Sequence, residues 1–92
     1  MPTPYQVLLY EYVENAVEAR APHREAHLAL IAGYVDDGRV KMGGALGDPP
    51  HGGLIVFAGD DPAVAEGFAA EDPYVREGVV TSWRVEPWTV VT

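Results

Sequence analysis

The sequence contains no cysteine. Disulfides, thiol catalysis and zinc sites built on cysteine are therefore excluded. It also lacks any run of 18 apolar residues, and a strand-like segment follows residues 1–4 without a basic and then apolar leader. We therefore expect a cytoplasmic protein without a membrane-spanning segment.

Basic residues are also few, with 6 Lys and Arg against 14 Asp and Glu and a formal net charge of -8. Phosphate backbones are bound by basic surfaces, so the charge balance argues against nucleic acid as a partner and against anionic membranes. The 92 residues are 48% hydrophobic and 10% aromatic, which is enough for one folded core. We expect residues 1–92 to form a single domain.

Hydrophobic periodicity predicts four strands and two helices in the order βαββαβ. The expected strands are residues 6–12, 40–44, 54–58 and 79–85, and the expected helices begin at Pro22 and at Asp61-Pro62. The first helix should end near Asp37-Gly38, and the second near Asp72, because Pro73 disfavours helical geometry in the residue before it. The remaining segments are predicted as a connector (14–21), an irregular Gly/Pro loop (43–53) and a turn (74–78).

This order is best satisfied by an α+β, ferredoxin-like antiparallel sheet with both helices on one face. The strand at 54–58 is apolar at each position, and the strand at 6–12 nearly so. Such strands are typical of a sheet that is buried on both sides. Since this chain would cover only one side, we expect a symmetric homodimer that packs open sheet face against open sheet face.

One stretch of the sequence combines burial with charge. Residues 20–28 carry four of the nine Lys, Arg and His residues, namely Arg20, His23, Arg24 and His27. At about 100° per residue, the helix stripe through Ile31 and its apolar neighbours continues back through His27, Arg24 and His23. A polar beginning on an inward-facing stripe indicates either a buried network or the wall of a pocket.

The predicted topology brings distant residues to this stretch. The two helices run antiparallel, so the first begins at the end of the domain where the second finishes, and His27 should face Asp72. The same end receives Tyr10 from the first strand, His51 from the Gly/Pro loop and Ser82 from the last strand. Segments far apart in the sequence thus converge on one place.

The chemistry of this group can be derived from its charges. A carboxylate at a helix C-terminus meets the negative end of the dipole, at a cost of about 0.3–1 kcal/mol, so Asp72 needs a partner. A hydrogen bond from His27 would fix the histidine tautomer and leave its other nitrogen free for acid–base catalysis. Arg20 and Arg24, near a helix N-terminus, would hold an anionic or phenolic substrate, with His23, His51, Ser82 and Tyr10 as further binding candidates.

An ordered set of motifs resembles the YciI-like (YCII) family over nearly the whole chain. The set consists of Glu18-Ala-Arg20-x-x-x-Arg24-Glu25-x-His27-Leu28, Gly43-Gly44, Asp72-Pro73-Tyr74-Val75 with Gly78, and Val85-x-Pro87-Trp88. The resemblance implies a ferredoxin-like, dimeric α/β-barrel fold and an active site built on a His and an Asp, here His27 and Asp72. One branch of the family is associated with dehydrochlorination of hydroxylated aromatics. Where the family commonly has Ala-Gly-Pro, this chain has Gly43-Gly44-Ala45, so no particular substrate is transferred.

The sequence allows three hypotheses about function. The first is a small-molecule enzyme with lyase- or isomerase-like proton-transfer chemistry and no organic cofactor. The second is a noncatalytic dimeric module that binds a small ligand or a partner protein in the same groove. The third is a purely structural dimer without a pocket. A zinc pair at His23 and His27, with His51 or Asp72 as third ligand, is disfavoured because the glutamate of the HExxH motif is missing.

Overall fold

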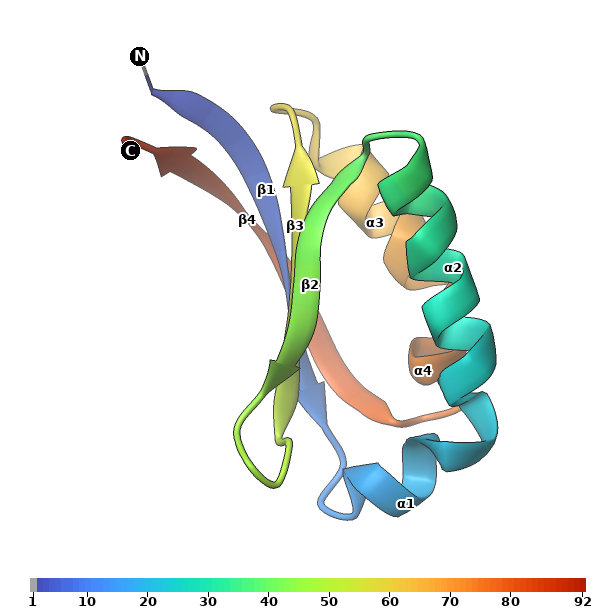
Figure 1. Ribbon diagram of the computed structural model, residues 1–92. Helices are drawn as coiled ribbons and strands as arrows, with labels where there is room; N and C mark the ends of the chain where they lie inside the picture. Colours follow the sequence, from blue (N-terminus) through green and yellow to red (C-terminus); the bar gives the residue numbers. More distant parts are fainter. Residues whose placement is uncertain (1) are drawn as a thin grey trace.

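The computed structural model describes residues 2–92 as one four-stranded sheet with helices on one of its faces (Figure 1). The strands are β1 (Thr3–Tyr12), β2 (Val40–Leu46), β3 (Gly52–Ala58) and β4 (Val80–Val90). The helices are α1 (Ala16–Arg20), α2 (Arg24–Asp36), α3 (Pro62–Glu71) and α4 (Pro73–Arg76), with a 3-10 helix η1 (Ala21–His23) between α1 and α2.

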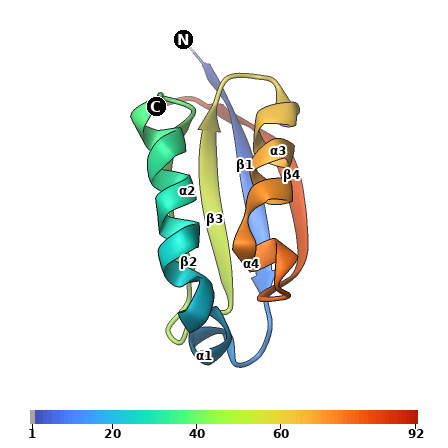
Figure 2. The same cartoon turned by 90° about the vertical axis from the view of Figure 1, so that its right-hand side faces the viewer.

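The sheet has the strand order β2-β3-β1-β4, and each neighbouring pair is antiparallel. This is the ferredoxin-like order, and it confirms the α+β prediction. Figure 2 shows α2 and α3 side by side over the same face of the sheet, with α1 and α4 near one end. The opposite face is free of helices among residues 2–92 (Figure 1).

The predicted starts and stops of the main helices follow ordinary capping chemistry. The Asp61 side chain accepts a hydrogen bond from the backbone N–H of Ala63 at 2.9 Å, and proline occupies the first turn of α3. Gly38, just beyond the end of α2, has φ of 83°, the left-handed conformation that glycine adopts most easily. Both boundaries were predicted correctly.

The connector predicted at residues 14–21 was wrong, because most of it is helical. Ala16–Arg20 forms α1, with Ala16 buried, and η1 follows before α2 begins at Arg24 rather than at Pro22. The sequence of this segment, Ala-Val-Glu-Ala-Arg, consists mostly of good helix formers. The 3-10 helix η1, with Pro22 in its first turn, then separates α1 from α2.

The irregular loop predicted at residues 43–53 is shorter than expected. Gly43 and Gly44 lie in β2, as the predicted strand at 40–44 has them, but β2 continues to Leu46 and β3 begins at Gly52, so only residues 47–51 form the connection. Glycine is a weak strand former, but pairing with neighbouring strands overrides that preference. Position 52 requires glycine because the backbone of β1 passes close to it. A Cβ there would collide with the carbonyl oxygen of Tyr10.

The third difference lies near the C-terminus. The predicted turn at 74–78 begins as the short helix α4, and β4 extends to Val90 instead of ending at Val85. This extension contains Pro87, which cannot donate a ladder hydrogen bond. Pro87 is tolerated because β4 is at the edge of the sheet, paired only with β1.

An aromatic cluster forms the core beneath the helices. Phe57 and Phe68 are fully buried, and Tyr34 is only 5% exposed. The Phe68 ring meets Tyr34 edge-on at 5.0 Å and Phe57 at 5.6 Å between ring centroids. This packing joins α2, α3 and β3.

The inward-facing stripe of α2 is narrower than the sequence predicted. His27 and Tyr34 are buried, and Ile31 is half-buried, whereas Leu28 and Val35 are 46% and 49% exposed. Only a narrow strip of the α2 surface packs against the sheet, so residues at the margin of the predicted stripe remain in contact with solvent.

Part of the open face of the sheet is apolar. Met42 and Trp88 are 67% and 48% exposed, and they line shallow hollows together with Leu54 and Val56. Because strand residues alternate between faces, these side chains lie opposite the aromatic core. The predicted homodimer through this face stays a prediction.

No helix within residues 2–92 is long and apolar enough to cross a lipid bilayer. The cytoplasmic location stays a prediction.

Candidate active site

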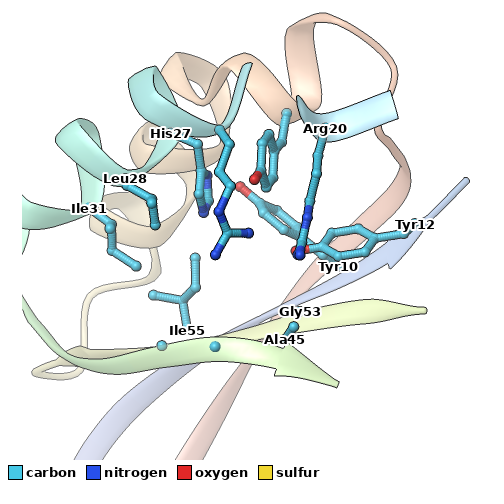
Figure 3. A pocket seen from close by; sticks show the side chains of 13 residues that line it. Tyr10, Tyr12, Arg20, His27, Leu28, Ile31, Ala45, Gly53 and Ile55 are labelled. Carbon is cyan, nitrogen blue, oxygen red and sulfur yellow. The ribbon is translucent and has the colours of Figure 1, made fainter. Parts of the chain in front are cut away.

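A cavity of about 170 Å³ lies between the helices and the β2–β3 side of the sheet. Figure 3 shows His27, Leu28 and Ile31 reaching into it from α2, with Ile55 below them on the sheet. Tyr10 and Tyr12 from β1 and Arg20 from α1 close its other side (Figure 3). The remaining lining residues are Arg24, Gly43, Gly44, Ala45, Gly53 and Tyr74.

The predicted contact between His27 and Asp72 is present. His27 Nδ1 lies 2.9 Å from Asp72 Oδ1 and 3.0 Å from Oδ2, and the Asp72 side chain is fully buried. A carboxylate only accepts, so we assign the proton of the neutral imidazole to Nδ1. Nε2 is then the free nitrogen, and no residue among 2–92 hydrogen-bonds it. The histidine side chain is 10% exposed and lines the cavity.

Asp72 holds a network of three donors. Besides His27, it accepts a hydrogen bond from the Tyr10 hydroxyl at 2.7 Å and from the backbone N–H of Tyr74 at 3.0 Å. Its backbone is extended, and it both ends α3 and caps α4. The sequence placed this carboxylate only at the unfavourable end of a helix dipole. The following cap supplies the compensating backbone donor.

Tyr10 is a permanent donor to this network. Burial, and then the negative charge of Asp72, raise the pKa of the Tyr10 phenol far above its usual range. The hydroxyl therefore keeps its proton at neutral pH. The Tyr10 hydroxyl contacts the Asp72 carboxylate from β1, and the His27 ring contacts the same carboxylate from α2.

Stacking fixes the orientation of the His27 ring. It lies parallel to the Tyr74 ring, with centroids 3.8 Å apart and an interplanar angle of 3°, and the Phe68 ring meets it edge-on at 6.5 Å. With Nδ1 bound to Asp72, the imidazole cannot rotate without losing both the stack and the hydrogen bond. The site is therefore preorganised.

Two guanidinium groups line the cavity. Arg20 is half-buried and Arg24 is exposed. Neither forms an ion pair within the part of the chain that the structure describes, where the salt bridges join other residues. Both charges oppose the effect of burial, which raises the pKa of the Tyr12 and Tyr74 phenols. Two cations against one carboxylate make this a positive pocket in an acidic protein.

Small residues keep the floor of the cavity open. Gly43, Ala45 and Gly53 lie on the β2 and β3 strands beneath it. A Cβ at Gly43 would come within 2.9 Å of the Ile31 side chain, and one at Gly53 within 3.0 Å of the Tyr12 hydroxyl. Larger side chains at these positions would occupy the space that a ligand needs.

The family model described as a YCII-related domain matches residues 5–89. The chain belongs to this family. An uncharacterized protein of Haemophilus influenzae is 29% identical over 96 aligned residues, covering 95% of this chain and 98% of its own. A solved structure, 5-chloro-2-hydroxyhydroquinone dehydrochlorinase from Burkholderia phenoliruptrix AC1100 in complex with 2,5-dihydroxybenzoquinone, has a TM-score of 0.75. That match covers 91% of this chain and 92% of the dehydrochlorinase at 17% identity, so it shows a shared fold.

Two predicted binding residues of this YCII-related chain lie outside the cavity. His51 and Ser82 line a separate hollow on the open face of the sheet. Ser82 pairs with Glu11 across β4 and β1, and its hydroxyl donates to the Glu11 carboxylate at 2.7 Å. Alternation along a strand places Glu11 on the face opposite Tyr10, so the prediction found the correct end of the domain but the wrong side of the sheet.

His23 does not line the cavity either. It is the last residue of η1 and is half-buried there, because the turn of chain before α2 removes it from the predicted helical stripe. The alternative zinc site is not assembled. His27 is committed to Asp72, His51 is across the sheet, and residues 2–92 contain no cluster of three metal-ligating side chains.

Two lining residues, Tyr12 and Tyr74, were not among the predicted site residues. Tyr12 had a detectable signal, since it shares a face with Tyr10 two residues earlier in the same strand. Tyr74 follows Asp72-Pro73. The cap at Asp72 turns the chain so that Tyr74 returns over His27, and that turn had been predicted without helical geometry.

Proposed function

We propose that this YCII-related protein is a small-molecule enzyme with lyase- or isomerase-like proton-transfer chemistry on a small oxygenated anion. One observation carries the proposal: a buried Asp72 carboxylate binds His27 Nδ1 while Nε2 is left for the cavity. A carboxylate–imidazole pair whose free nitrogen borders a ligand-sized space is suited to general acid–base catalysis.

In the proposed reaction, His27 Nε2 removes a proton from a substrate hydroxyl or from a carbon next to a carbonyl group. Asp72 stabilises the imidazolium that forms, and Arg20 and Arg24 stabilise the negative charge left on the substrate. The released electron pair then expels a leaving group, or the proton returns at another position. These two outcomes are the lyase and the isomerase reactions. No cofactor is part of this proposal.

The size and charge of the cavity support a ring-shaped substrate. Cavities of about 150 Å³ accommodate benzene, and this one measures about 170 Å³. Its cationic and phenolic walls favour phenolate, enolate or carboxylate oxygens. The likeness in fold to a dehydrochlorinase that binds 2,5-dihydroxybenzoquinone supports hydroxylated rings as the first compounds to test.

The decisive experiment compares the wild type with His27→Gln. Candidates such as 5-chloro-2-hydroxyhydroquinone are followed by absorbance and chloride release, and binding of 2,5-dihydroxybenzoquinone is measured by calorimetry. We expect turnover to fall about 10²- to 10⁴-fold in His27→Gln while ring binding persists. His23→Gln is the matched control and should retain wild-type turnover, because His23 does not line the cavity.

Undiminished turnover in His27→Gln would contradict the acid–base assignment. Binding without turnover of any hydroxylated ring would instead support a noncatalytic ligand-binding module. A wild type that binds none of these compounds would argue against the proposed substrate class.

We also propose that the protein is a homodimer through the open sheet face. The exposed Met42 and Trp88 side chains and the hollows beside Leu54 form an apolar surface that a second copy would cover. The test is sedimentation velocity. We expect a dimer for the wild type and for Val35→Glu, a control on the helical side, and a monomer for the double variant Met42→Glu, Trp88→Glu. A monomeric wild type would contradict this proposal.

A further inference from the structure

The hydroxyl of Tyr74 has an unusual environment. The residue is only 1% exposed, and Tyr74 Oη is a buried side-chain oxygen without a hydrogen-bond partner among residues 2–92. Buried polar atoms in proteins are nearly always hydrogen-bonded, and an unpaired one costs free energy. Tyr74 also lines the cavity, so something that enters the cavity can supply the missing partner.

Packing does not account for this hydroxyl. The Tyr74 ring stacks on His27 at 3.8 Å and meets the Tyr12 ring edge-on at 6.1 Å, and both contacts involve the ring. A phenylalanine would preserve the stack and the edge contact without burying an unpaired oxygen. The hydroxyl is therefore a cost to the folded chain, which points to a role in binding.

The neighbours of the hydroxyl identify the chemistry of its partner. Burial is the largest influence on the Tyr74 phenol and raises its pKa, so the group stays a protonated donor at neutral pH. The Arg20 and Arg24 guanidiniums act on the phenol as positive charges, and Arg24 also lowers its pKa as a nearby hydrogen-bond donor. Guanidinium groups have no acceptor atoms, so neither arginine can accept the proton of the Tyr74 hydroxyl. A partner placed among one O–H donor and two cations must accept hydrogen bonds, and negative charge favours it further.

We infer that the Tyr74 hydroxyl donates a hydrogen bond to an anionic oxygen of the substrate and thereby selects rings that carry such an oxygen. This inference rests on the proposed function and deepens it. The Tyr74 and His27 rings stack 3.8 Å apart and both line the cavity, so a single substrate ring in the cavity lies beside both residues. Tyr74 is thus a specificity-determining residue, and His27 remains the proton-transfer residue.

The test is Tyr74→Phe, because stability and binding should change in opposite directions. We expect the affinity for 2,5-dihydroxybenzoquinone, measured by calorimetry, to fall about 10- to 100-fold. The thermal unfolding midpoint should stay the same or rise, because the variant removes an unpaired buried oxygen. Tyr34→Phe is the matched control. Tyr34 is a buried tyrosine outside the cavity, and its loss of a hydroxyl should leave the affinity unchanged.

The possible outcomes separate the inference from the proposed function. Wild-type affinity in Tyr74→Phe overturns the inference, because a water molecule rather than the substrate would then be the partner of the hydroxyl. The acid–base proposal would remain intact. A lower unfolding midpoint together with lower affinity also overturns it, since the hydroxyl would then be structural. If the wild type does not bind the quinone, the proposed substrate class fails and the inference fails with it.

Discussion

Two aspartates open helices in the same way, yet only one of them belongs to the site. Asp61 precedes α3 and Asp72 precedes α4, and each is followed by a proline in the first turn. Both have extended backbones, and both accept a hydrogen bond from the backbone N–H two residues later, at 2.9 Å and 3.0 Å. Locally the two caps are alike.

Their surroundings differ. Asp61 is exposed, and its only side-chain hydrogen bond within residues 2–92 is the cap itself. Asp72 is fully buried and also binds the Tyr10 hydroxyl and the His27 ring, from 62 and 45 residues away in the chain. A helix cap thus becomes part of a candidate active site when the fold removes it from water and brings distant donors to it.

Of the variants that separate the two caps, Asp72→Ala should lose the most stability. It leaves three donors without their acceptor in the protein interior, so we expect a loss of about 3–5 kcal/mol in the free energy of unfolding. Asp61→Ala removes one exposed cap and should cost about 1 kcal/mol. Urea denaturation followed by circular dichroism measures both. Equal losses in the two variants would show that the buried network contributes nothing beyond capping.

Much of the fold could be predicted because its signals are local. The continuous apolar run at residues 54–58, the cap at Asp61-Pro62 and the glycine after Asp37 each indicate a local preference that the structure follows. The misassigned segments are those where distant parts of the chain decide. Gly52 and Gly53, which were predicted as loop, are strand residues only because β1 and β2 pair with them, and Pro87 is tolerated only because β4 is an edge.

The residues of the candidate site also differ in how far they could be predicted from the sequence. His27 and Asp72 could be found because helix spacing and topology place them within reach of each other. His51 and Ser82 were placed on the wrong face of the sheet. The topology predicts the end of the sheet at which a residue lies, but the face on which its side chain lies depends on the strand register. For Ser82 that register is shown by its pairing with Glu11. Tyr74 was missed because its position depends on a four-residue helix after proline.

A smaller effect is expected for Tyr10→Phe, which removes one of the donors that distinguish Asp72 from Asp61. The lost hydrogen bond to a carboxylate should cost about 1.5–3 kcal/mol at neutral pH. The same variant should also change the response to alkali. Burial and the charge of Asp72 raise the pKa of the Tyr10 phenol, so the folded chain holds the phenol proton more tightly than the unfolded chain does.

The sign of the pH effect follows from this difference. Below the ordinary phenol pKa of about 10, both states keep the proton and the stability is fully present. Above it the unfolded chain loses the proton while the folded chain keeps it, so stability falls by up to about 1.4 kcal/mol per pH unit for this group. Urea denaturation from pH 8 to pH 11 should therefore show a shallower alkaline decline in Tyr10→Phe than in the wild type. Parallel declines would mean that the phenol ionises equally in both states, and the buried Tyr10–Asp72 hydrogen bond would then not distinguish this cap from the exposed one.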